Sequence, residues 1–208
     1  IERVLSDMGC RTVATYSTKD KNMPFVINAD EAICIGDAPA KKSYLNMKEI
    51  LSAALLTGCD AIHPGYGFLS ESHEFAKRCE YCGLTFIGPT SRNILLMGNK
   101  EYARKLVSGL KVAVIPGEDD INSLSDAVRA ANKIGYPVMI KASNGGGGKG
   151  IRLIRTVKEL KKNYSIVVEE AKRSFGSSSF YIEKYINPVK HIEVQIEVDK
   201  FGTAICLP

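Results

Sequence analysis

Four consecutive glycines stand between two lysines in the stretch KASNGGGGKG, which runs from Lys141 to Gly150. Backbone N–H groups without side chains can approach phosphate oxygens closely, and Lys141 and Lys149 add positive charge. Ordering a glycine costs about 0.5–1 kcal/mol relative to alanine, so a run of four calls for a compensating ligand. Strand patterns on both sides place the run at a hairpin tip. We therefore predict a phosphate-binding lid, with a merely flexible hairpin as the alternative.

Known phosphate-binding loops do not match this stretch. A P-loop has the pattern GxxxxGK[ST] between a strand and a helix, and the dinucleotide fingerprint GxGxxG also opens a helix. Here a strand pattern follows the glycines instead. The sequence therefore indicates a lid of a different kind, carried by a β-hairpin.

A strand with two distinct faces follows about forty residues later, in YIEKYI (181–186). Side chains alternate along a strand, so one face carries Tyr181, Glu183 and Tyr185. The other face carries Ile182, Lys184 and Ile186. An ordinary amphipathic strand is the simple interpretation. Downstream of a phosphate lid, the same strand is a candidate for contacts to the base of a nucleotide.

Two loops in the first half follow strand patterns and are rich in glycine and proline. They are AIHPGYGFLSES (61–72) and FIGP (86–89). Loops at the carboxyl ends of parallel strands line ligand crevices. We expect His63 to fix the first loop through hydrogen bonds rather than to titrate.

The elements that must position these residues divide into two halves. In the first half, strand patterns alternate with helix patterns. The strands are expected at 11–17, 31–36, 60–65 and 85–89, and the helices at 1–9, 44–58 and 70–83. This alternation predicts an α/β domain with a parallel sheet and helices on both faces. We expect the first strand of that sheet to be missing, upstream of Ile1.

The second half predicts an α+β domain with antiparallel hairpins. Its helices are expected at 99–110, 122–135 and 157–176, and its strands at 136–142, 150–156, 179–186 and 191–208, with a turn at 200–202. We place the two domains at 1–96 and 97–208, with a lid subdomain at about 114–186. The sequence stops after a fresh strand, so we expect the second domain to be truncated.

Composition excludes few classes of protein. The 208 residues carry a net charge of +5, with 45% apolar and 25% charged residues, as in ordinary globular proteins. No apolar run approaches the ~20 residues of a membrane span, so we expect no membrane partner. Basic residues near the glycine run leave nucleic-acid binding as an alternative, but aromatic residues are sparse there. The residues in question are Lys141, Lys149, Arg152 and Arg155.

The six cysteines indicate a reducing compartment. Cys10, Cys34, Cys59 and Cys206 adjoin apolar or small residues, and we expect them in the core. Cys79 and Cys82 form a single CxxC at the end of a predicted helix, which is a weak signal for metal or redox chemistry.

A lysine followed by a glycine-rich hairpin lid resembles the ATP-grasp enzymes. With HPGYGFLSE (63–71), FIGP (86–89), MGNK (97–100) and the strand EKYI, the chain is similar to biotin carboxylase over its whole length. The resemblance implies a nucleotide between two α+β lobes and a Mg²⁺-dependent use of ATP and bicarbonate. The implied reaction carboxylates biotin on a carrier protein through carboxyphosphate, the first half-reaction of acetyl-CoA, propionyl-CoA and pyruvate carboxylases.

The resemblance also implies roles for single residues. Positions that match nucleotide contacts are Lys100, Lys141, Gly145, Gly146, Gly147, Gly148, Glu183, Lys184, Ile186 and His191. The two lysines would meet phosphates, the glycines would form the lid, 183–186 would meet adenine, and the histidine would lie beside the ribose or be structural. Tyr66 and Gly67 match the wall against which the ureido ring of biotin rests.

The family's metal-binding glutamates and its bicarbonate-binding and biotin-orienting residues match nothing before Pro208. We therefore expect no catalytic residue, no metal ligand and no turnover in this stretch alone. The resemblance implies a carrier protein, a carboxyltransferase and a second copy of the chain as partners, in the cytoplasm or the mitochondrial matrix. A shortened, non-catalytic nucleotide-binding or assembly module is the alternative.

Overall fold

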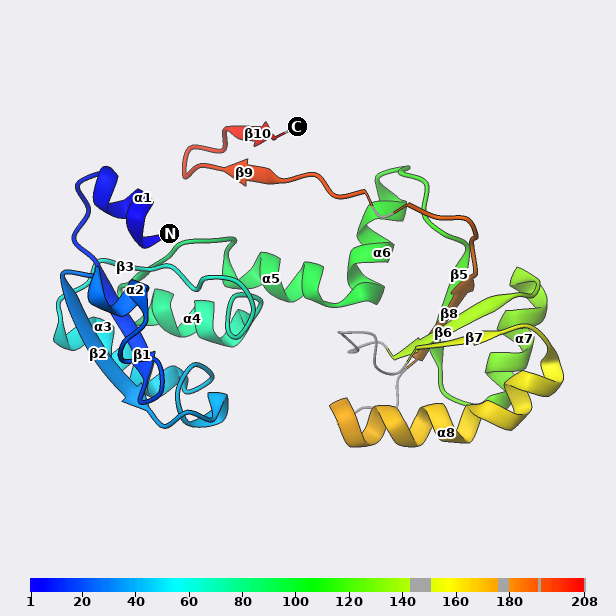
Figure 1. Ribbon diagram of the computed structural model, residues 1–208. Coiled ribbons are helices and arrows are strands. Elements are labelled where there is room, and N and C mark those ends of the chain that lie inside the picture. Colours follow the sequence, from blue (N-terminus) through cyan, green and yellow to red (C-terminus); the bar gives the residue numbers. More distant parts are fainter. Residues whose placement is uncertain (143–150, 176–179, 191, 208) are drawn as a thin grey trace. The chain divides into compact units, whose positions relative to one another are not determined.

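The computed structural model describes residues 1–142, 151–175, 180–190 and 192–207. The chain divides into two compact units, Ile1–Val112 and Ala113–Pro208. Figure 1 shows the elements of both units, coloured from blue to red along the sequence. The predicted lid glycines and His191 lie outside the described residues.

The first unit alternates strands and helices, as the sequence predicts. Its strands are β1 (Val13–Ser17), β2 (Glu31–Gly36), β3 (Ala61–Ile62) and β4 (Thr85–Phe86). Its helices are α1 (Glu2–Asp7), α2 (Pro24–Ile27), the 3-10 helix η1 (Ala40–Lys42), α3 (Met47–Leu56), α4 (His73–Tyr81), α5 (Ser91–Gly98) and α6 (Lys100–Gly109). β1 pairs with β2 and β3 pairs with β4, both in parallel. The parallel pairing is confirmed, but the described strands form two separate pairs rather than one continuous sheet.

Helices α3 and α4 and the strand β4 enclose the core of the first unit. Its buried residues include Leu51, Phe75 and Phe86. The rings of Phe75 and Phe86 meet edge to face with centroids 6.1 Å apart, a favourable aromatic geometry. Ser72 caps α4 by accepting a hydrogen bond from the backbone N–H of Phe75, so the helix expected at 70–83 begins after a serine cap.

The expectation that four cysteines lie in the core is wrong for three of them. Cys10, Cys34 and Cys206 are exposed, and Cys59 is half-buried. Apolar neighbours in sequence misled the prediction, because neighbours along a strand point to opposite faces, as Cys34 and the buried Ile35 do. Cys79 is fully buried, and this burial raises the pKa of its thiol to about 11.

The second unit holds one four-stranded antiparallel sheet in the order β5-β8-β6-β7. Its sheet strands are β5 (Gly117–Ile121), β6 (Val138–Ala142), β7 (Ile151–Ile154) and β8 (Phe180–Lys184). Its helices are α7 (Leu124–Ile134) and α8 (Val157–Phe175). The predicted α+β architecture is confirmed, whereas the sequence interpretation missed β5 here and α2 and α5 in the first unit.

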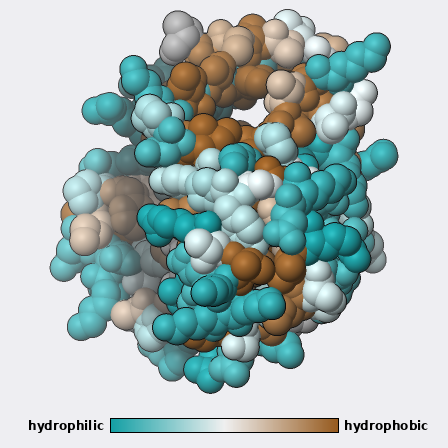
Figure 2. All heavy atoms as spheres, turned by 90° about the vertical axis from the view of Figure 1, so that its right-hand side faces the viewer, coloured by the Kyte–Doolittle hydropathy of each residue, from teal (hydrophilic) through white to brown (hydrophobic). Residues whose placement is uncertain are grey.

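Helices α7 and α8 cover one face of this sheet. Buried alanines of α7 and Leu160 and Val167 of α8 pack against the strand residues Val138, Ile140, Phe180 and Ile182. The small alanine side chains allow α7 to approach the sheet closely. Figure 1 shows both helices on the same side of the strands, and Figure 2 shows a mainly hydrophilic outer surface on the side of α7.

A separate antiparallel hairpin, β9 (Ile196–Val198) and β10 (Ala204–Cys206), follows the sheet. The carboxylate of Asp199 closes its turn by accepting hydrogen bonds from the backbone N–H groups of Phe201 and Thr203, both at 2.8 Å. The predicted turn at 200–202 is therefore confirmed. Among the described residues, no helix combines the length and apolar character that crossing a membrane requires.

Candidate functional site

The face of the four-stranded sheet opposite α7 and α8 carries two of the predicted site residues of the second unit, Lys141 and Glu183. Met139 and Lys141 of β6 alternate with the core residues Val138 and Ile140. In register with them on β8 are Glu183, opposite Met139, and Tyr181, opposite Lys141. Met139, Lys141, Tyr181 and Glu183 therefore share one surface, which we name the Lys141 face.

The ammonium of Lys141 is held in place by two neighbours on this face. Its Nζ forms an ion pair with the carboxylate of Glu183 and lies 5.9 Å from the centroid of the Tyr181 ring. Both charges are partly withdrawn from water, since the side chains of Lys141 and Glu183 are only 23% and 12% exposed. The pair presents a fixed cation with a counter-charge, which an anionic ligand can share or replace.

Lys184 lies on the other face, as the strand alternation predicts. Its Nζ donates to the backbone carbonyls of Gly135 at 2.8 Å and Tyr136 at 3.1 Å, where α7 ends. Its backbone N–H donates to the carbonyl of Pro116 at 2.8 Å, and that of Tyr185 donates to Pro137 at 3.1 Å. The ammonium of Lys184 is therefore engaged away from the Lys141 face.

The loop from His63 to Ser72 joins β3 to α4 and holds its shape through its own backbone. The backbone N–H of Gly65 donates to Nδ1 of His63 at 3.0 Å, so the expected structural role of this histidine is confirmed. Gly65 and Gly67 have φ values of 72° and 74°, a conformation that glycine adopts without strain. Phe68 shares the left-handed region with a φ of 44°.

Side chains of this loop point in different directions. Tyr66 is 99% exposed, whereas Leu69 is buried in the core of the unit. The ring of Phe68 contacts that of Tyr44 with centroids 5.1 Å apart. Tyr44 in turn donates a hydrogen bond from its hydroxyl to Asp20 at 2.5 Å. The loop is thus anchored at Leu69 and Phe68, and it projects Tyr66 into solvent.

The structure brings together only part of the predicted set. Lys141 and Glu183 touch, Lys184 is the last residue of β8, and Ile186 lies two residues beyond the strand and is 45% exposed. Lys100 is the first residue of α6. Sequence reasoning missed Met139, although the alternation of VMIKA would have placed it beside Lys141. It also missed the carbonyls of Gly135 and Tyr136, for which the sequence carries no signal.

Among the described residues, Lys141 and Arg152 do not join in the contiguous basic face that nucleic-acid binding would require, and Lys149 lies outside the described residues. Ile140 pairs with Arg152 and Lys141 pairs with Ile151, so Lys141 and Arg152 lie on opposite faces of the sheet. Each is paired with a carboxylate, Glu183 for the lysine and Glu170 for the arginine. Paired charges on opposite faces do not make a surface for a phosphate backbone.

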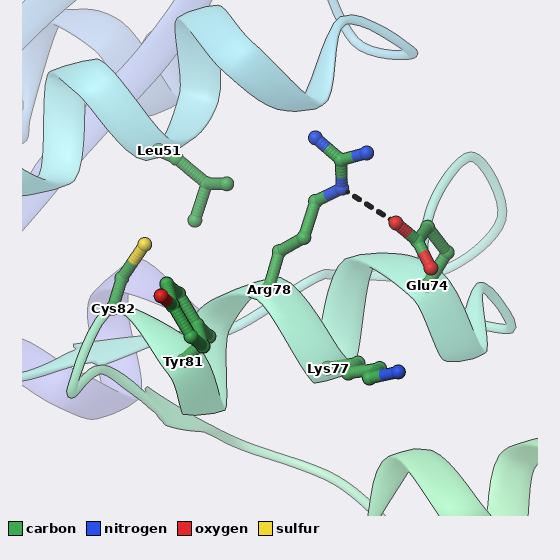
Figure 3. A pocket seen from close by; sticks show the side chains of 6 residues that line it. All are labelled: Leu51, Glu74, Lys77, Arg78, Tyr81 and Cys82. Atoms are coloured by element: carbon green, nitrogen blue, oxygen red, sulfur yellow. Dashed lines mark hydrogen bonds and ion pairs between the residues drawn. The ribbon is translucent and has the colours of Figure 1, made fainter.

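A shallow pocket of about 300 Å³ lies in the first unit, against α3 and α4. It is lined by Leu51, Glu74, Lys77, Arg78, Tyr81 and Cys82, and Figure 3 shows these side chains. Arg78 is engaged by Glu74 at 2.8 Å, and the same contact lowers the pKa of that carboxyl. None of the predicted site residues lines this pocket. Among the described residues, no group of three histidine, cysteine, aspartate or glutamate side chains is arranged to hold a metal ion.

Two protein families match the chain. The family described as biotin carboxylase, N-terminal domain, matches residues 1–94. The family described as carbamoyl-phosphate synthase L chain, ATP binding domain, matches residues 99–208. The two matches follow each other along the chain and cover nearly all of it.

Curated proteins that are similar to this chain include biotin carboxylases. Biotin carboxylase 1 of Bacillus subtilis is 48% identical over 208 residues, which are 100% of this chain and 46% of that protein. Biotin carboxylase of Haemophilus influenzae is 46% identical over 209 residues, or 100% of this chain and 47% of that protein. The chain therefore spans about half the length of the curated relatives it matches.

Solved structures show the same similarity in three dimensions. A biotin carboxylase from Campylobacter jejuni in a β-γ-ATP complex superposes with a TM-score of 0.94 at 41% identity, over 98% of this chain and 46% of that one. The biotin carboxylase domain dimer of Hydrogenobacter thermophilus 2-oxoglutarate carboxylase, with MgADP, ADP and bicarbonate, gives 0.92 at 43% identity, over 98% and 45%. From the two family matches and these relatives, the chain belongs to the biotin carboxylase family, with its N-terminal domain followed by an ATP-grasp-type ATP-binding domain.

Proposed function

We propose that the protein is the biotin carboxylase component of acetyl-CoA carboxylase or a related carboxylase. It would use ATP and bicarbonate to carboxylate biotin on a carrier protein. The family membership supports this activity, as do the names of relatives that match the chain end to end. The observation that carries the proposal is the Lys141 face, where a held lysine lies on the strand that enters the glycine run.

We propose that ATP binds on the Lys141 face. Lys141 would meet phosphate oxygens, and Glu183 would keep its ammonium oriented until the nucleotide arrives. Lys100 and the glycines 145–148 would add phosphate contacts, and His191 would lie beside the ribose. The hinge 183–186 would meet adenine through its backbone and through the exposed side chain of Ile186.

The residues present fit a nucleotide better than they fit a free metal ion. A fixed lysine whose counter-charge can be displaced suits a phosphate. Relatives with bound nucleotide support the assignment, because one is a complex with β-γ-ATP and another contains MgADP. Magnesium would accompany the nucleotide and neutralise phosphate charge, and we assign it no ligand within residues 1–208.

We propose that biotin rests against Tyr66 and Gly67. The tyrosine ring is 99% exposed on an anchored loop, and the glycine beside it presents backbone without a side chain. A flat, accessible aromatic surface suits a planar ureido ring. His63 would support the loop, through the hydrogen bond it accepts from Gly65, rather than transfer protons.

We propose three partners for the whole protein. They are a biotin carboxyl carrier protein or domain, a carboxyltransferase and a second copy of the chain, and the dimeric Hydrogenobacter structure supports the last. Relatives include bacterial, chloroplastic and mitochondrial proteins. We propose the cytoplasm or the mitochondrial matrix as the location.

The test measures ATP hydrolysis and biotin carboxylation by the full natural protein with free biotin. Hydrolysis that depends on bicarbonate and rises with biotin is the expected result. The 208-residue chain alone is measured beside it, and we expect no turnover from it. Hydrolysis that ignores bicarbonate would contradict the proposal, and ATP binding without any turnover would favour a non-catalytic nucleotide-binding module.

A further inference from the structure

Lys184 fastens the end of β8 to the turn between α7 and β6. Its Nζ donates to the carbonyl oxygens of Gly135 and Tyr136, at 2.8 Å and 3.1 Å. Gly135 is the residue that ends α7, with a φ of 81°. The carbonyls at a helix C-terminus carry partial negative charge, so an ammonium there is favourably placed. The side chain thus joins two segments that lie 48 and 49 residues apart in the sequence.

The backbone of the same short segment is also held from two sides. The N–H of Lys184 donates to the carbonyl of Pro116, just before β5, and the N–H of Tyr185 donates to the carbonyl of Pro137, just before β6. A Cβ placed on Gly135 would lie 4.0 Å from Nζ of Lys184, which shows how closely the ammonium lies over the helix end. Residues 184 and 185 are therefore fixed against α7, β5 and β6 together.

We propose that the side chain of Lys184 positions the hinge for the nucleotide base and does not itself contact the base. The inference rests on the proposed function and assigns this residue a role within it. By bonding the two carbonyls, its ammonium would set the position of the hinge 183–186, whose backbone would meet the edge of adenine. The side chain itself points to the opposite face from Lys141.

Hinge position matters because adenine and guanine differ in their edge groups. Adenine carries a donor amine at position 6, and guanine carries an acceptor oxygen there. A backbone that presents fixed donors and acceptors favours one of the two, but only while it is held in place. Releasing the hinge should therefore weaken ATP binding and also reduce the preference for ATP over GTP.

The test replaces Lys184 with methionine, which keeps the length of the side chain and removes the ammonium. In the full natural protein, ATP and GTP affinities are measured by calorimetry, and KM and kcat are measured for ATP. For K184M we expect about a tenfold loss of ATP affinity, as for one charge-assisted hydrogen bond, with a smaller change for GTP. KM for ATP should rise while kcat changes little. Loss of folded protein alone would lower kcat and leave both KM and the ATP preference unchanged.

Two variants accompany K184M. Lys184→Arg keeps a donor cation and should recover most of the ATP affinity. Lys161→Met makes the same chemical change at an exposed position of α8 and should behave like the unsubstituted protein. If K184M does not fold, Lys184→Gln is measured in its place. Unchanged ATP affinity and ATP preference would overturn the inference alone, whereas an unsubstituted protein that binds no ATP would overturn the proposed function with it.

Discussion

The Lys141 face and the loop from His63 to Ser72 both carry predicted site residues, but they hold them in opposite ways. Lys141 and Glu183 are 23% and 12% exposed and lie on strands whose other face is the core of their unit. Tyr66 is 99% exposed on a loop that is anchored by its neighbours Phe68 and Leu69. Substitutions in the strands should therefore change both ligand affinity and stability. Substitutions of exposed loop residues should change ligand affinity and leave stability nearly unchanged.

The largest effect is expected from Lys141→Met on the strand side of this comparison. Loss of the ammonium should lower ATP affinity about 10- to 100-fold, because hydrogen bonds to charged groups contribute about 1.5–3 kcal/mol. It should also lower stability, since the carboxylate of Glu183 loses its partner while remaining only 12% exposed. Calorimetry with ATP and thermal unfolding of the full natural protein measure the two effects.

A double variant separates the two effects of K141M. Adding Glu183→Gln removes the unpaired charge, so stability should recover in part while ATP affinity stays low. Unchanged ATP affinity in K141M, confirmed with folded protein, would show that the Lys141 face is not the nucleotide site.

A smaller and purely functional effect is expected from Tyr66→Ala on the loop side. Because the side chain is 99% exposed, the free energy of unfolding should change by less than about 0.5 kcal/mol. KM for free biotin should rise about three- to tenfold, since the ring would lose a stacking surface. Tyr81→Ala is the matched control, because Tyr81 is 93% exposed on α4 of the same unit and should change neither quantity. A large loss of stability in Y66A would contradict the separation of binding from folding.

The smallest effect concerns the anchor of the loop at low pH. Hydrogen bonds from Ser17 and Tyr44 hold the pKa of Asp20 below its ordinary value of 3.8. A lowered pKa in the folded state gives stability that is present above pH 3.8 and is lost as the pH falls below it. The melting temperature of the unsubstituted protein should therefore fall more steeply with decreasing pH over that window than the melting temperature of the Asp20→Asn variant. Parallel curves for the two proteins would show that Asp20 does not anchor Tyr44 and, through it, Phe68.

Most of the fold could be predicted from the alternation of apolar and polar residues in strands and from residues typical of helix ends. The alternation of YIEKYI placed Glu183 and Lys184 on opposite faces, and the structure confirms it through their partners Lys141 and Gly135. The helix expected at 70–83 forms as α4, with Ser72 as its cap and Gly83 just after its end. These features depend on a few neighbouring residues, which is why the sequence alone predicts them.

Features that depend on distant residues were missed. β5 (Gly117–Ile121) carries three polar residues in five, and it forms a strand because it pairs with β8 some sixty residues away. Cys34 was expected in the core from its apolar neighbours, but its place in β2 turns it to solvent. The bonds from Lys184 to two backbone carbonyls have no sequence signature, because any residue supplies a carbonyl.

The pleat of β8 constrains how this protein can change over time. Phe180 and Ile182 lie in the core, whereas Tyr181 and Glu183 contact Lys141. Core residues and site residues therefore alternate along the strand. Inserting or deleting one residue would exchange the two sets, burying Glu183 among alanines and turning Ile182 toward the ammonium. Evolution can therefore lengthen or shorten the connecting loops of this unit, but within β8 it is restricted to exchanging one side chain for another.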